Sequence, residues 1–126
     1  ILTEGSDVTI ISTGSATRDA LEAVDILKEK GIHAELIGMP TVYPIDEELV
    51  RKSAQKTRAV VTVEEHYVHG GLGSFTADAL CEMDCIRQKR LGVPMEYGKT
   101  CGDYRELVAY YHLDGSGIAK SVEVFL

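Results

Sequence analysis

The chain has 126 residues, of which 44% are hydrophobic and 26% are charged, and its formal net charge is −7. This length suits one compact domain, and this composition is that of an ordinary globular protein rather than a disordered or fibrous one. The acidic balance argues against nucleic acid or an anionic membrane as a partner, because both select basic surfaces.

The cysteines and the chain start bear on the cellular compartment. Cys81, Cys85 and Cys101 are an odd number without a Cys-x-x-Cys pair, so neither a disulfide framework nor a zinc ribbon is indicated. No apolar run is long enough to span a bilayer, and the charged start has no signal-peptide core. We therefore expect a cytoplasmic protein. Because the chain begins at Ile1 rather than at Met, we also expect that it was cut from something longer.

Three segments form the first predicted unit. Residues 7–12 are β-branched and apolar on both faces, as in a strand buried between helices. Apolar residues at helical spacing then run from Ala16 to Leu27, with acidic residues early, Lys28 and Lys30 late and Gly31 as the stop. Residues 32–39 return as a second strand. The sequence therefore predicts a βαβ unit with a right-handed crossover.

The alternation of strand and helix continues to the end of the chain. After a loop, Asp46 is a good N-cap for a second helix. We then expect a strand at 59–65, a helix at 71–82, a weaker strand at 85–93, and helices at 103–111 and after Asp114. This order predicts an α/β fold with a mostly parallel sheet covered on both faces.

Residues 61–74, VTVEEHYVHGGLGS, contain a pattern that is suggestive of a metal site. His66 and His69 are three residues apart beside two glutamates, and imidazole and carboxylate are competent ligands for zinc or iron. A strand exit, however, does not supply the helical face on which an HExxH site aims two imidazoles at one ion. We therefore expect no metal site and no catalytic residue here, and histidines that are partly buried or lie at an interface.

The glycine cluster in the same stretch predicts a helix entry. GGLGS lacks the third glycine of the dinucleotide-binding fingerprint, so a cofactor site is not indicated. The glycines still allow close backbone approach, and the N–H groups at the helix start can face an anion or a partner carboxylate. The alternative is a turn that only packs closely. The candidate anion or interface site consists of Glu65, His66, Gly70, Gly71, Gly73 and Ser74.

Four blocks in chain order carry a resemblance to a known family: DVTIISTGSATRDALEA, MPTVYPIDEELV, VTVEEHYVHGGLGSFTADAL and DYRELVAYYHLDGSGIAKSVEVFL. They resemble the C-terminal domain of transketolase and its thiamine-diphosphate relatives, most specifically at Pro44–Asp46 and Glu64–Ser74. The likeness covers residues 1–126 and is closest to the short or split transketolase C-terminal subunit. Deoxyxylulose-phosphate synthase and the β subunit of 2-oxoacid dehydrogenases share this domain.

The resemblance implies a three-layer αβα sandwich with a five-stranded sheet, one strand of which is antiparallel and is expected near Tyr97–Thr100. It also implies that this domain binds no cofactor. In the family, thiamine diphosphate and Mg²⁺ lie between pyrophosphate-binding and pyrimidine-binding domains of two protomers, so those domains are the expected partners in a homodimer. The pyrophosphate domain binds Mg²⁺ through an asparagine, and this chain contains no asparagine.

We therefore expect a non-catalytic domain that supports the dimer of an enzyme moving a two-carbon ketol unit between sugar phosphates. One alternative is the same domain in deoxyxylulose-phosphate synthase or a 2-oxoacid dehydrogenase. Another is a free-standing regulatory module that binds an anion or nucleotide through the glycine turn. The tyrosine-rich residues 97–111 are the best candidate for an association surface.

Overall fold

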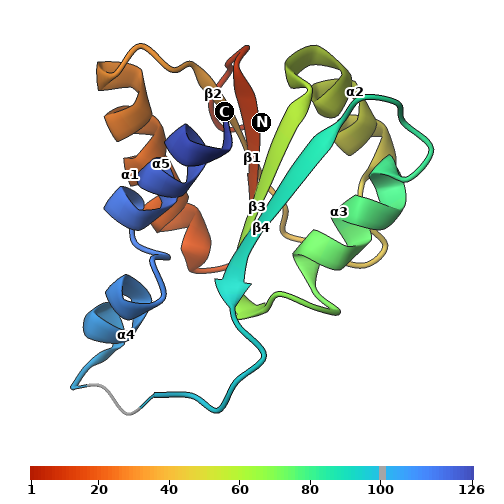
Figure 1. The fold of residues 1–126 in the computed structure, drawn as a ribbon. Coiled ribbons are helices and arrows are strands. Elements are labelled where there is room, and N and C mark those ends of the chain that lie inside the picture. The colour runs from red at the N-terminus through yellow and green to blue at the C-terminus, as the bar shows by residue number, and fades with distance from the viewer. Residues whose placement is uncertain (100–101) are drawn as a thin grey trace.

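The computed structural model describes residues 1–99 and 102–126. Within them the chain alternates between strands and helices, as the sequence predicts, and the element bounds differ from the predicted ones by a few residues (Figure 1). In chain order the elements are β1 (Val8–Ser12), α1 (Ala16–Glu29), β2 (Ala34–Gly38), α2 (Glu47–Thr57), β3 (Ala59–Tyr67), α3 (Leu72–Leu80), β4 (Arg87–Val93), α4 (Tyr104–Tyr110) and α5 (Gly115–Phe125).

The four strands form one parallel sheet in the order β2-β1-β3-β4. Every residue of β1 is buried, which confirms the prediction of a strand covered on both faces. β3 is buried from Ala59 to Glu64 and exposed from Glu65 to Tyr67. The last three residues of β3 therefore project beyond the helix layers at the carboxyl edge of the sheet.

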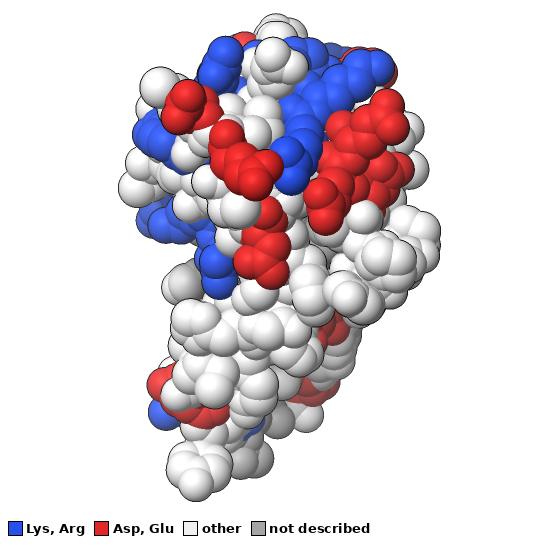
Figure 2. Space-filling view, turned by 90° about the vertical axis from the view of Figure 1, so that its right-hand side faces the viewer, with Lys and Arg blue, Asp and Glu red and all other residues white. Residues whose placement is uncertain are grey.

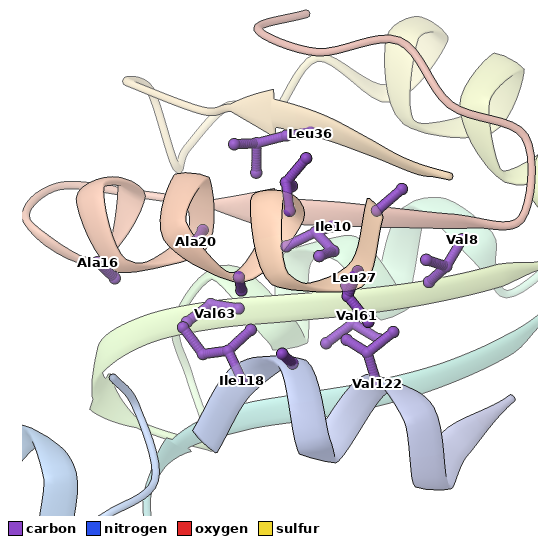
Figure 3. Close-up of a cluster of buried hydrophobic side chains, with 14 of the residues drawn as sticks. Val8, Ile10, Ala16, Ala20, Leu27, Leu36, Val61, Val63, Ile118 and Val122 are labelled. Carbon is purple, nitrogen blue, oxygen red and sulfur yellow. The ribbon is translucent and has the colours of Figure 1, made fainter. Parts of the chain in front are cut away.

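Helices cover both faces of this sheet. On one face, Val61 and Val63 of β3 belong to a cluster of buried side chains with Leu27 of α1 and Ile118 of α5 (Figure 3). On the other face, alternate strand residues such as Val60 pack with side chains of α2 and α3. Since side chains of a strand alternate between its faces, this apolar pattern accounts for the αβα layering.

The expectation of a fifth, antiparallel strand near Tyr97–Thr100 was wrong for the part of the segment that the structure describes; Thr100 lies outside the described residues. Pro94 follows β4 directly and has no N–H for a sheet hydrogen bond, and residues 94–99 are exposed and form no strand. The sheet described here is wholly parallel. Its antiparallel neighbour is a single bridge at the opposite edge, between Thr3 and Leu36.

The strand order defines a carboxyl edge with a switch point. β1 connects through α1 to β2 on one side, and β3 connects through α3 to β4 on the other. Adjacent strands whose connections leave in opposite directions form the crevice in which open α/β sheets bind ligands. In Figure 1 this edge lies at the bottom, with α4 beside it, whereas both chain termini lie at the top.

Candidate functional site

The carboxylate of Glu64 closes the N-terminal end of α3. Glu64 is 2% exposed, and its oxygens accept hydrogen bonds from the N–H groups of Leu72 at 2.7 Å and Gly73 at 2.9 Å. A helix N-terminus favours an anion because its first N–H groups lack helical partners and the helix dipole is positive there. The chain thus supplies its own anion at the glycine turn.

Two glycines of the turn permit this close arrangement. A β carbon built on Gly71 would collide with Glu64 Oε2 and lie 2.9 Å from His66 Nδ1. A β carbon on Gly73 would lie 2.9 Å from both Thr62 Oγ1 and Arg90 Cδ. Neither glycine has the left-handed backbone that would by itself demand glycine. Both therefore serve close approach between α3 and the sheet.

Other polar groups of the turn pair with each other and with the neighbouring strands β3 and β4. Gly70, which has φ +80°, donates its N–H to Ser74 Oγ at 2.8 Å, and Arg90 Nη1 lies 3.4 Å from the same oxygen. His66 Nδ1 lies 2.8 Å from the carbonyl oxygen of Tyr67. A carbonyl can only accept, so this nitrogen carries the proton.

The predicted site residues therefore come together, but in two groups. His66 and the glycine turn lie around the Glu64 carboxylate, whereas Glu65 points to the other side and accepts a hydrogen bond from the hydroxyl of Tyr104 on α4. His69 is exposed. Within residues 1–99 and 102–126, no three His, Cys, Asp or Glu side chains gather as a metal site requires.

Sequence analysis missed the part that Glu64 plays. The signal was available in the alternation of β3: Val60 faces α2 and α3, so Glu64, four residues later, lies on the same face of the strand. A carboxylate there points toward the helix that follows the glycine turn. The candidate site predicted from the sequence contains its exposed neighbour Glu65 instead.

A second pair of polar contacts joins α4 to the carboxyl edge. Arg105 Nη1 donates to Asp19 Oδ2 at 3.2 Å, and Arg105 Nη2 forms an ion-pair contact with Asp19 Oδ1 at 2.9 Å. The hydrogen bond and charge of Asp19 raise the pKa of Arg105, and the hydrogen bond to Glu65 raises the pKa of Tyr104. Both α4 residues thus remain in their protonated, donating forms at neutral pH.

Large apolar side chains are exposed along the same edge. Tyr67, Met95 and Tyr97 line a depression of about 280 Å³, and Tyr97 is 98% exposed. Tyr43 packs against Phe75, with 5.1 Å between ring centroids and the ring planes tilted by 42°. On the face drawn in Figure 2, charged side chains gather in the upper half, while the half toward the carboxyl edge is largely uncharged. Such a surface is typical of protein–protein contact.

The glycine turn does not fit thiamine diphosphate, the cofactor that the resemblance implies for other domains of the whole enzyme. A diphosphate would need the N–H groups of Leu72 and Gly73, which donate to Glu64. It would also be repelled by the negative charge of that buried carboxylate.

Among the described residues no helix is both long and apolar enough to cross a membrane. Fold and edge together define an αβα sandwich domain whose glycine turn is closed by its own side chains.

Comparison with known proteins shows the family to which this domain belongs. Residues 1–118 match the family described as the C-terminal domain of transketolase. A protein described as a transketolase C-terminal section, from Methanocaldococcus jannaschii, is 44% identical over 123 residues, or 97% of this chain and 38% of that protein. 1-Deoxy-D-xylulose-5-phosphate synthase 1 of Geobacter sulfurreducens is 40% identical over 128 residues, or 100% of this chain and 20% of that protein.

A comparison with solved structures finds the same family. A split-gene transketolase, described as an inactive beta4 tetramer, matches with a TM-score of 0.90 and 40% identity, covering 100% of this chain and 40% of that one. The chain therefore belongs to the family of transketolase C-terminal domains. It spans less than half the length of each of these relatives.

Proposed function

We propose that this chain is the non-catalytic C-terminal domain of a thiamine-diphosphate-dependent transketolase, in which it supports assembly of the dimer. The enzyme would transfer a two-carbon ketol unit between sugar phosphates. Its pyrophosphate-binding and pyrimidine-binding domains would hold thiamine diphosphate and Mg²⁺ and would be the partners of this domain. Identity of 44% to a transketolase C-terminal section over 97% of the chain is the observation that carries the proposal.

The geometry favours an assembly role over catalysis. The helix start that could hold a phosphate is closed by Glu64. The exposed residues Tyr67, Met95 and Tyr97 line a depression on the carboxyl edge, which Glu96 also lines. Aromatic residues and methionine are enriched at protein interfaces. The same closure of the glycine turn argues against a free-standing module that binds anions or nucleotides.

The surface can be tested in the complete enzyme. We expect the double substitution of Met95 and Tyr97 by Asp to weaken assembly at least tenfold, because two charges would be buried without partners. Val124→Asp is the matched control, since Val124 is 77% exposed on α5, away from this edge. Sedimentation measures assembly and a ketol-transfer assay measures activity. Equal assembly of both variants would refute the interface.

A second candidate parent enzyme is 1-deoxy-D-xylulose-5-phosphate synthase, favoured by 40% identity over the whole chain to the Geobacter sulfurreducens protein. The domain would have the same supporting role there. The two parents differ in the product that the complete enzyme forms. Assays for ketol transfer and for deoxyxylulose-phosphate formation on one preparation therefore separate them.

A further inference from the structure

The helix α4 is attached to the rest of the domain by few apolar contacts. It has seven residues, and Val108 is its one buried side chain. A helix of two turns is not stable by itself in water, and the burial of one valine is a small apolar contribution to its stability. The position of α4 therefore depends on additional contacts.

Those contacts come from the first two residues of the helix. Arg105 pairs with Asp19 of α1, a carboxylate that is 1% exposed. Tyr104 donates its hydroxyl to Glu65 at the end of β3. A buried carboxylate without a cation is strongly unfavourable, even near a helix N-terminus, so Asp19 favours the position of α4 in which Arg105 reaches it.

The two contacts span the switch point of the sheet. Asp19 lies in the first turn of α1, directly after β1, and Glu65 lies at the carboxyl end of β3. β1 and β3 are neighbours in the sheet. Tyr104 and Arg105 therefore occupy the edge at which open α/β sheets bind ligands.

We infer that the Asp19–Arg105 pair is a latch that holds α4 against the first turn of α1 and the end of β3, and that breaking this pair opens α4 while the sandwich stays folded. The side chain of Arg105 is 45% exposed. Water can therefore reach the guanidinium group and replace its contact with Asp19 when the pair breaks. The two buried clusters that hold the sandwich contain one α4 residue, Val108, among their buried members. Opening thus leaves most of the core in place.

Amide hydrogen exchange of the full chain, resolved by residue, tests the latch. In Arg105→Ala we expect exchange in residues 107–110 to accelerate at least tenfold, while α5 and β3 keep their protection. Arg105→Lys should restore part of the protection because it keeps the charge. Arg51→Ala is the matched control: Arg51 is 38% exposed and pairs with Glu47 and Glu82, on α2 and near the end of α3.

Two outcomes would overturn the inference. One is unchanged exchange in α4 of Arg105→Ala, and the other is an equal loss of protection in α4, α5 and β3. If Arg105→Ala unfolds because Asp19 is left unpaired, the double variant Asp19→Ala/Arg105→Ala removes that charge and should show an open α4 on a folded sandwich. These exchange rates test how α4 is attached and do not measure assembly, so failure of the inference would leave the proposed assembly role untouched.

Discussion

Glu64 and Gly71 depend on each other: the carboxylate of Glu64 occupies the space that a side chain on residue 71 would need. The carboxylate lies there because it accepts the N–H groups of Leu72 and Gly73. The two partners are seven positions apart in the chain, across the end of β3 and the turn into α3. The glycine turn is thus shaped to receive an internal carboxylate.

Gly71→Val should therefore destabilise the domain. The new side chain would displace Glu64 from hydrogen bonds that involve a charge, so we expect a loss of about 3 kcal/mol in the free energy of unfolding, measured by denaturant titration. His69→Ala should change it by less than about 0.5 kcal/mol because His69 is exposed. Gly98→Val is a control for the substitution itself, since nothing lies within 4 Å of a β carbon there. Similar losses for all three variants would contradict the close approach.

Glu64→Gln should show that the negative charge of Glu64 contributes to the stability of the domain. A glutamine has one acceptor oxygen for two N–H groups, and its own NH₂ group would face the second donor. We expect a loss of about 2 kcal/mol, again by denaturant titration. Glu65→Gln removes a neighbouring charge at an exposed position and should change the free energy by less than about 0.5 kcal/mol. A larger effect at Glu65 would mean that the wrong glutamate has been assigned to the helix start.

Residues 1–126 alone should not bind thiamine diphosphate in the presence of Mg²⁺. The glycine turn offers no free N–H pair, because Leu72 and Gly73 already donate to Glu64. Isothermal titration calorimetry should give no heat beyond dilution, and adenosine diphosphate serves as a second probe for the regulatory-module alternative. Micromolar binding of either ligand would contradict the proposed non-catalytic role.

Much of this fold could be predicted from the sequence because its signals are local. The apolar run before Ser12 and the cap residue Asp46, whose side chain accepts from Leu49 N at 3.0 Å, both act within a few residues. The pairing of Asp19 with Arg105 joins positions 86 residues apart, and no spacing rule connects them. The fifth strand is implied by the resemblance alone. Pro94 follows β4 directly, before the segment in which that strand is expected.

The pH dependence of stability should include a contribution from Asp7. The backbone N–H of His33 donates to its carboxylate at 2.7 Å, and this bond lowers the pKa of Asp7 from its usual 3.8. A lowered pKa in the folded state stabilises the protein above the unfolded-state value, and this stabilisation is lost as the pH falls through the folded-state pKa. Asp7→Asn should cost roughly 0.5 kcal/mol at pH 7, since the exposed group is screened by water. The difference should shrink below pH 3.8; an equal difference in urea titrations at pH 7 and pH 3 would contradict this.

The isolated chain should associate weakly, and more strongly at high salt. Tyr97 is 98% exposed and Met95 is 66% exposed on the carboxyl edge, and burying such side chains against a second copy removes apolar area from water. The net charge of −7 opposes this association at low salt, and added salt screens the repulsion because the Debye length falls from about 30 Å at 0.01 M to about 8 Å at 0.15 M.

Sedimentation at several concentrations and at two salt levels measures this association. We expect a dimer whose dissociation constant lies in the range of about 0.1–1 mM and decreases as salt is added. Tyr97→Ser should weaken the dimer, whereas Val124→Ser, at a position 77% exposed on α5, should not. A chain that stays monomeric at high protein and high salt, or a dimer that Val124→Ser weakens equally, would mean that the carboxyl edge is not the association surface.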